Sequence, residues 1–192
     1  MYIAIEGVDG VGKTTTLEVI QPVLNKFVTE NDLPEVRFFA ETEIKPTHTF
    51  KSEKEKQVYL AMSYALQRMN ILSLLNLDKH IYIADRSVFS SYAYQGKCIQ
   101  FPTLKLMNKC CVLPDHVILI KSGNIYFEDY DMRYISALRE TKVPYTTFDK
   151  YEVNLTEKII TEIIGLIIKK YSFKISENWL QKYNKQRWDI LD

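Results

Sequence analysis

A glycine-rich motif directly after an apolar run is the feature that most constrains the fold of this chain. Residues 7–14 read Gly-Val-Asp-Gly-Val-Gly-Lys-Thr and match G-x-x-x-x-G-K-[ST], and the apolar residues 2–5 before them predict a strand. Three glycines in eight positions let the backbone wrap so that its N–H groups converge on a polyphosphate, at the positive end of the following helix. The motif therefore predicts a phosphate-binding loop between a strand and a helix.

Within this loop two side chains have distinct predicted roles. Lys13 is expected to reach the β- and γ-phosphates of a nucleotide, and the Thr14 hydroxyl is expected to bind Mg²⁺. The residues expected around the donor phosphates are Gly7, Asp9, Gly10, Val11, Gly12, Lys13, Thr14 and Thr15. The sequence thus predicts a site for a magnesium-bound nucleoside triphosphate.

The composition narrows the classes of partner. A chain of 192 residues fits one domain. Its 25 basic and 24 acidic side chains leave a net charge of +1. This overall charge predicts neither general binding of nucleic acid nor an electrostatic membrane anchor. Any phosphate ligand must then be held by local charge.

Cysteine usage and hydropathy indicate the compartment. Cys98, Cys110 and Cys111 form neither a metal-ligand spacing nor a disulfide framework. The first predicted strand leaves no room for a signal peptide, and no apolar run approaches the length of a membrane span. We expect a cytoplasmic protein.

Predicted strands and helices alternate along the chain. The strands are expected at residues 2–5, 36–40, 81–84, 116–120 and 145–148. The helices are expected at 14–29, 52–77, 87–94, 103–111, 131–140, from Asn154 or Thr156 to 171, and at 176–188. This order predicts an α/β fold with a mostly parallel five-stranded sheet and helices on both faces. Ligands of such sheets bind beyond the carboxyl ends of the strands.

Polar residues follow two of the predicted strands at that edge. Asp85, which ends one strand, can hold Mg²⁺ directly or through water, and Arg86 can neutralise phosphate, although the two could also form a surface pair. Asp9 is unusual inside a phosphate loop. It could orient an arginine, accept a hydrogen bond from a substrate sugar, or bond only its own backbone. Glu41 lies at the end of the second strand and is a candidate wall of the site.

Several of these motifs together resemble one family. Residues 5–15 are similar to the opening of the thymidylate kinases, which carry an acidic residue in the phosphate loop. Asp85-Arg86-Ser87 and residues 90–96 resemble the family's Asp-Arg motif and its A-Y-Q-G segment. Tyr64 and Arg68, one helical turn apart, match the aromatic-x-x-x-Arg that holds thymine. The resemblance covers residues 1–120 and, more loosely, 145–171, and implies a three-layer P-loop kinase fold.

The resemblance also implies a reaction, ATP + dTMP to ADP + dTDP. In it Arg86 would grip the acceptor phosphate, Tyr64 would stack on the base, and Arg68 with Ser91 would contact thymine. The acceptor-binding residues expected on this basis are Asp9, Glu41, Tyr64, Arg68, Arg86, Ser91, Tyr92 and Gln95. On residue pattern alone Tyr64 could equally be a core residue of an amphipathic helix. Family resemblance further suggests a homodimer with residues 52–77 as the contact, although packing within the chain explains the apolar face of that helix equally well.

The chain departs from the family pattern at two places. Ala40-Glu41-Thr42 stands where relatives usually have Arg-Glu-Pro, so one phosphate-binding arginine is missing. A short, atypical lid is expected near 121–130, and residues 121–129 contain no arginine. Arg133 could replace a lid arginine or form a surface pair with Asp129. The expected catalytic set is Lys13, Arg86, Asp9 and Arg133.

The sequence leaves two other functional interpretations open. Residues 85–91 also resemble the acidic-Arg-Ser segment of the deoxynucleoside kinases, in which Glu41 would be the base that deprotonates a sugar hydroxyl. Asp9 argues against this reading, because the loop of that family resembles G-N-I-G-S-G-K. Alternatively, the poor lid and Ala40 would suit a nucleotide-binding protein with little turnover, whereas the presence of Lys13 and Arg86 opposes it.

Overall fold

The structure is a computed structural model that describes residues 1–171. Its five strands form one parallel sheet in the order β2-β3-β1-β4-β5. The strands are β1 (Tyr2–Glu6), β2 (Val36–Ala40), β3 (Ile81–Asp85), β4 (His116–Lys121) and β5 (Tyr145–Asp149). The α/β fold with a five-stranded parallel sheet is therefore confirmed. The helix expected at 176–188 lies outside the described residues.

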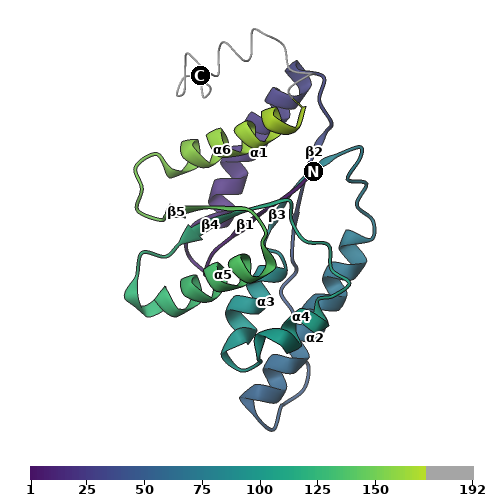
Figure 1. The fold of residues 1–192 in the computed structure, drawn as a ribbon, viewed down its shortest axis with the longest axis vertical. Coiled ribbons are helices and arrows are strands. Elements are labelled where there is room, and N and C mark those ends of the chain that lie inside the picture. The colour runs from purple at the N-terminus through teal and green to yellow at the C-terminus, as the bar shows by residue number, and fades with distance from the viewer. Residues whose placement is uncertain (172–192) are drawn as a thin grey trace.

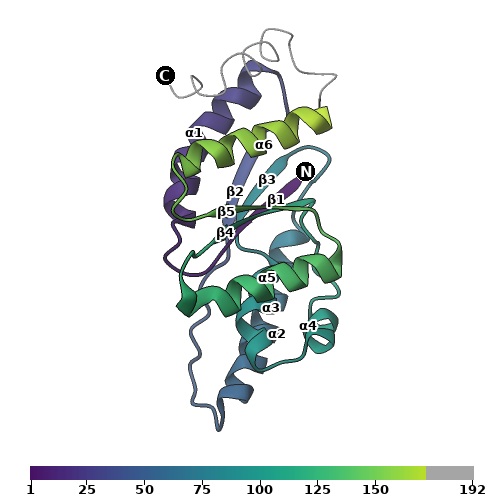
Figure 2. The same ribbon diagram turned by 60° about the vertical axis from the view of Figure 1, so that its left-hand side comes forward.

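Helices cover both faces of the sheet and produce three layers (Figures 1 and 2). α1 and α6 lie on one face, and α2, α3, α4 and α5 lie on the other. Their bounds are α1 (Lys13–Glu30), α2 (Glu53–Leu72), α3 (Val88–Tyr94), α4 (Phe101–Met107), α5 (Glu128–Thr141) and α6 (Leu155–Tyr171). Two short 3₁₀ turns, η1 (Gln95–Lys97) and η2 (Ile125–Phe127), precede α4 and α5.

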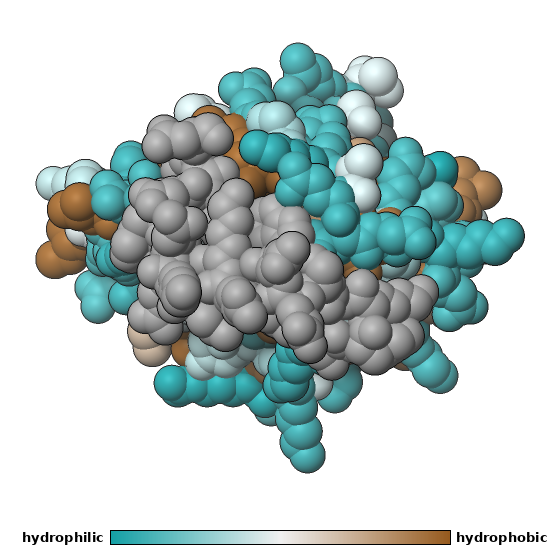
Figure 3. Space-filling model, turned by 90° about the horizontal axis from the view of Figure 1, so that it is seen from above, coloured by the Kyte–Doolittle hydropathy of each residue, from teal (hydrophilic) through white to brown (hydrophobic). Residues whose placement is uncertain are grey.

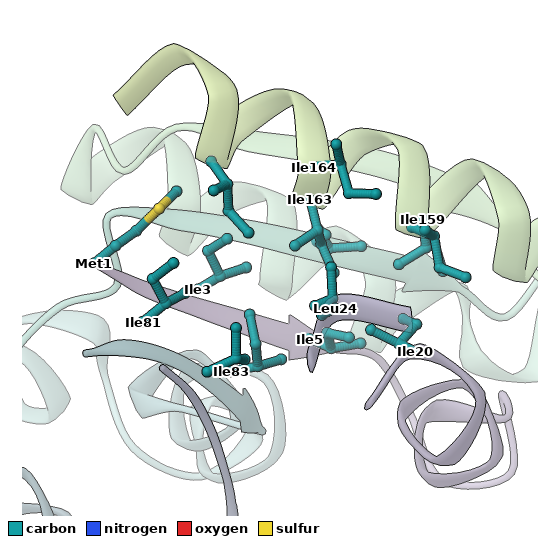
Figure 4. Close-up of a cluster of buried hydrophobic side chains, with 14 of the residues drawn as sticks. Met1, Ile3, Ile5, Ile20, Leu24, Ile81, Ile83, Ile159, Ile163 and Ile164 are labelled. Carbon is teal, nitrogen blue, oxygen red and sulfur yellow. The ribbon is translucent and has the colours of Figure 1, made fainter. Parts of the chain in front are cut away.

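The alternation of side chains along β1 builds two cores, one on each face of the sheet. Ile3 and Ile5 belong to the cluster beneath α1 and α6, whereas Tyr2 and Ala4 belong to the cluster beneath α2 to α5. Figure 4 shows the first cluster, in which isoleucines of α6 and residues of α1 point at the strands. Because both faces are covered, β1 is buried throughout its length, and its end is held rigidly where the phosphate loop begins.

The outer surface on the α1 and α6 side is mainly hydrophilic where Figure 3 shows it in colour. Of the helices within residues 1–171, none is both long enough and apolar enough to cross a membrane. The apolar residues of α6 instead face the sheet.

Helix ends differ from the prediction where side chains compete for backbone groups. Ser52 caps α2 as expected, accepting from the Glu55 amide at 3.2 Å, but α2 ends at Leu72 rather than at residue 77. There the Ser73 hydroxyl donates to the Asn70 carbonyl at 2.8 Å. α4 spans Phe101–Met107 rather than 103–111. α5 begins three residues early, at Glu128, because its acidic first turn favours a helix start.

Candidate functional site

The phosphate loop connects β1 to α1 and needs glycine at its first position. Gly7 has a φ of 148°, and a Cβ there would collide with the Ile120 carbonyl oxygen and lie 2.9 Å from Val11 Cγ2. α1 starts after Gly12, which has a φ of 96° and offers no side-chain cap. The first N–H groups of α1 thus remain available to an anion. A cleft of about 440 Å³ lies over this turn, lined by Asp9, Gly10, Gly12, Lys13, Thr14, Thr15, Asp85 and Arg86.

Lys13 lies inside the loop rather than in open solvent. Its Nζ donates to the carbonyl oxygens of Gly7 at 3.0 Å and of Val8 at 2.9 Å. Burial, followed by the positive charge of Arg86, lowers the pKa of Lys13. An anion entering the cleft would offset both effects, because it would supply negative charge to a cation that is poorly solvated.

Thr14 and Asp85 place hard oxygen ligands at one wall of the same cleft. The Thr14 hydroxyl donates to Asp85 Oδ2 at 3.1 Å. Asp85 Oδ1 is buried and has no hydrogen-bond partner among residues 1–171. This pair fits Mg²⁺, which prefers oxygen ligands and keeps several waters. The described part of the chain holds no cluster of three or more metal-ligating side chains, so phosphate and water would have to complete the coordination shell.

Arg86 joins the phosphate loop to the end of β3. Its Nη2 forms an ion pair with Asp9, and its guanidinium lies 5.2 Å from the centroid of the Tyr94 ring. Arg86 has a φ of 77°, a left-handed conformation that costs a non-glycine residue about 1–2 kcal/mol. The role of Asp9 as an orienter of an arginine is the one that this geometry supports. The Asp9 side chain is 81% exposed, so the pair can open toward an incoming substrate.

A second, larger cleft of about 730 Å³ adjoins the first. Its lining comprises Asp9, Glu41, Glu43, Glu53, Gln57, Leu60, Tyr64, Arg68, Arg86, Ser90, Ser91, Tyr94, Gln95, Lys97, Cys98 and Tyr130. Asp9 and Arg86 line both clefts. The ion pair therefore stands at the boundary between the phosphate loop and a cleft large enough for a nucleotide.

Glu41 and Arg68 form the floor of the larger cleft. Both Glu41 oxygens accept from the Arg68 guanidinium, and both side chains are only 4% exposed. Arg68 Nη1 also donates to Ser91 Oγ at 2.8 Å and to Asn108 Oδ1 at 3.2 Å. The guanidinium lies 5.6 Å from the Tyr64 ring centroid. Four expected acceptor residues are thus brought together, and Glu41 holds Arg68 in place.

Two expected site residues lie away from the clefts. Neither of the clefts described within residues 1–171 is lined by Tyr92 or Arg133. Ser91 of α3 and Gln95 of η1 line the larger cleft, whereas Tyr92 is buried and its ring stacks on that of Phe101, with 4.8 Å between the ring centroids. The structure therefore does not bring Tyr92 together with the other expected acceptor residues in the larger cleft. Arg133 Nη1 donates to the Ala93 carbonyl at 3.3 Å, and its Nη2 lies 3.7 Å from Asp129. This geometry supports the alternative reading, the surface pair with Asp129.

Sequence patterns missed several residues around the phosphate loop and Arg86, among them Lys150, Glu6 and Tyr134. Lys150 Nζ donates to the Gly10 carbonyl at 2.9 Å, and its position directly after β5 on the ligand edge is a signal that could have found it. Glu6 is a buried acid at the end of an apolar strand, which is a second usable signal. Tyr134 lies within α5 and has no such signal, because its role depends on packing between α5 and α3.

The fold and the site together define the class of the protein. A parallel sheet whose first strand runs into a phosphate loop, with an Asp-Arg pair at the end of the adjacent strand, characterises the P-loop nucleotide-binding proteins. The family model of the thymidylate kinases matches residues 5–128. The chain belongs to the thymidylate kinase family.

Individual relatives agree with this assignment. The chain is 33% identical over 132 residues to a probable thymidylate kinase of Methanosphaera stadtmanae, a match that covers 62% of this chain and 66% of the relative. A match to the thymidylate kinase of Campylobacter jejuni, at 26% identity, covers 92% of this chain and 96% of the relative. The chain thus spans just under two thirds of the length of the Methanosphaera relative.

A solved structure supports the fold. The thymidylate kinase of Ehrlichia chaffeensis superposes with a TM-score of 0.66 at 20% identity, and the match covers 87% of this chain and 98% of that one. The resemblance extends beyond residue 128, where the family model ends.

Proposed function

We propose that the protein transfers the γ-phosphate of ATP to dTMP, giving ADP and dTDP. The observation that carries the proposal is the pair of adjoining clefts that share Asp9 and Arg86, one over the phosphate loop and one over Tyr64 and Arg68. Two phosphorylated substrates in these clefts would meet at Arg86. The names of the relatives supply the identity of the acceptor.

The proposed chemistry is positioning and neutralisation of charge. Transfer between two anions is slow chiefly because negative charge must be brought together and spread over the moving group. Lys13 would bind the β- and γ-phosphates, and Arg86 would bind the acceptor phosphate from the other side. Thr14 and Asp85 would hold Mg²⁺, which supplies Lewis-acid neutralisation of the donor phosphates.

The larger cleft offers an aromatic face and a polar floor for the acceptor base. Tyr64 provides the aromatic ring, and Arg68 and Ser91, already hydrogen-bonded to each other, provide polar groups at fixed positions. Gln95 lines the same cleft. Because Glu41 and Asn108 fix the guanidinium of Arg68, the base would meet a preorganised surface rather than a mobile arginine.

The geometry favours a phosphate acceptor over a nucleoside acceptor. A deoxynucleoside kinase needs a free carboxylate near the sugar hydroxyl. Both oxygens of Glu41 are engaged by Arg68, so Glu41 is poorly placed to serve as that base. A binding protein with little turnover would not need Lys13, Thr14, Asp85 and Arg86 around one cleft.

A coupled assay of ADP release across nucleosides and nucleoside monophosphates tests the proposal. We expect Mg²⁺-dependent turnover with dTMP and a much smaller rate with thymidine. Turnover with thymidine alone would establish the nucleoside kinase. Binding of ATP without turnover on any acceptor would establish the nucleotide-binding protein.

We also propose that the protein is a homodimer and acts in the cytoplasm. Met62, Leu66 and Met69 form an exposed apolar stripe along α2 at helical spacing, and a second copy could cover it. The cysteines at 98, 110 and 111 are free thiols, in keeping with a reducing compartment.

A further inference from the structure

A buried polar cluster lies directly behind Arg86, and the proposed transfer step does not use it. Its members are Glu6 at the end of β1, Ser87 and Ser90 at the start of α3, and Tyr134 in α5. All four side chains are buried, and Glu6 and Tyr134 are fully so. Burying a carboxylate and three hydroxyls is costly unless each polar atom is paired, so the pairing within this cluster is informative.

The contacts within the cluster indicate which hydroxyl groups act as hydrogen-bond donors and which groups accept. Ser87 and Ser90 donate to the two oxygens of Glu6 at 2.6 and 2.7 Å. A serine hydroxyl has one hydrogen, so the 3.1 Å contact between Ser90 and Tyr134 leaves the tyrosine as donor. Burial raises the pKa of Tyr134 well above its ordinary value, so that proton is retained at neutral pH.

Arg86 is held from the rear by this cluster. Its Nη1 lies 3.1 Å from Ser90 Oγ, 3.4 Å from the Tyr134 hydroxyl and 3.3 Å from the Gly7 carbonyl oxygen. The Tyr134 hydroxyl is itself 3.4 Å from that carbonyl. One buried hydroxyl therefore contacts both the arginine and the first residue of the phosphate loop.

We propose that Tyr134 is a positioning residue, which, with Ser90 and Glu6, orients the Arg86 guanidinium relative to the phosphate loop. The inference rests on the proposed function for its kinetic consequence. Nη2 is left to face Asp9 and the clefts, because the buried cluster engages Nη1.

The variant Tyr134→Phe tests the proposal because it removes one hydroxyl and preserves the ring. We expect kcat/KM for dTMP to fall about tenfold, with KM for ATP little changed, since the loss of one hydrogen bond to a charged group has this magnitude. Tyr82→Phe is the matched control. Tyr82 is also buried, and its hydroxyl accepts from the Asn76 amide at 3.0 Å, away from both clefts.

A double-mutant cycle separates positioning from a merely structural role. If Tyr134 acts through Arg86, the loss caused by Tyr134→Phe shrinks to near nothing in an Arg86→Lys background, because the lysine lacks Nη1. If instead the fold-losses in kcat/KM of the two single variants multiply in the double variant, the proposal is overturned. Should Tyr134→Phe fold poorly in thermal melts, Ser90→Ala removes the neighbouring contact of the cluster with Arg86 Nη1 and enters the same cycle.

A measurement that needs no substrate distinguishes failure of this inference from failure of the proposed function. Arginine-side-chain ¹⁵N NMR, with the Arg86 signals assigned by their loss in Arg86→Lys, reports how freely the guanidinium rotates. We expect restricted rotation in the wild type and in Tyr82→Phe, and faster rotation in Tyr134→Phe. Unchanged rotation would overturn the inference, whereas faster rotation together with no dTMP turnover by the wild type would overturn the proposed function alone.

Discussion

At the scale of single residues, Glu41 keeps its place in a motif that changes on either side of it. The arginine usual at position 40 is replaced by Ala40, and the glutamate that follows pairs with Arg68. The pair is buried on both sides, so each charge depends on the other for compensation. Glu41 thus holds Arg68, and with it the floor of the larger cleft, in place.

Replacing Glu41 by glutamine should destabilise the protein, because Arg68 would keep a buried charge without its counter-charge. We expect a loss of about 3 kcal/mol in the free energy of unfolding, measured by urea denaturation. Glu35→Gln is the control, since the Glu35–Arg37 pair is exposed and should contribute less than about 1 kcal/mol. Equal effects of the two substitutions would contradict the structural role of Glu41.

Lys13→Ala should remove phosphoryl transfer while the fold persists. Within residues 1–171 the Lys13 amino group bonds two carbonyl oxygens of the phosphate loop, so under the proposed function its main role would be to bind phosphate. We expect kcat to fall by about 100-fold or more, as for the loss of a preorganised transition-state contact. Steady-state kinetics and circular dichroism measure the two properties, and an unchanged rate would exclude Lys13 from the mechanism.

At the scale of elements, the segment between β4 and α5 supplies no arginine to the proposed donor site. η2 and the early start of α5 leave a short connection, and its sequence, residues 121–129, contains no arginine. The loop after β5 meets the phosphate loop instead, through the Lys150 contact with the Gly10 carbonyl. A lysine from this loop is therefore in position to neutralise donor phosphate.

Lys150→Ala should raise KM for ATP several-fold and leave KM for dTMP unchanged, because one cation beside the donor phosphates is lost. Initial-rate kinetics with each substrate varied in turn measure this effect. Lys105→Ala, on the exposed surface of α4, changes net charge equally and should leave both constants unchanged. An effect of Lys150→Ala confined to dTMP would show that the lysine serves the acceptor instead.

At the scale of the whole molecule, α2 presents the exposed apolar stripe of Met62, Leu66 and Met69. Met62 and Leu66 are both 59% exposed, although α2 also packs against α3 and α4. Exposed apolar side chains aligned on one helix face are a common feature of subunit contacts. The stripe is the surface on which the proposed homodimer would form.

Leu66→Glu should convert the proposed dimer to a monomer, because a carboxylate would be buried without a partner at the contact. Light scattering should give twice the chain mass for the wild type and the single-chain mass for the variant. Leu106→Glu, at an exposed leucine of α4, should leave the mass unchanged. A monomeric wild type would refute the dimer proposal directly.

Much of this arrangement follows from local sequence. Alternating strands and helices predicted the sheet, and the glycine motif after residues 2–5 predicted the phosphate loop with Lys13 and Thr14. Such features depend on short-range geometry, namely the period of apolar residues and the glycine that a crowded turn requires. The end of α2 and the start of α5 were misplaced, because apolar periodicity does not fix the first or last residue of a helix.

Local sequence alone predicted the class of fold, the phosphate loop and the edge of the sheet on which the clefts lie. Tertiary packing alone decided that Tyr92 faces the interior, that Glu41 pairs with Arg68, and that Tyr134 reaches Arg86. The physical reason is the separation along the chain over which each kind of interaction acts. Periodicity and turn chemistry act over a few residues, whereas these contacts join side chains 9 to 48 positions apart, whose meeting depends on how the helices pack against the sheet.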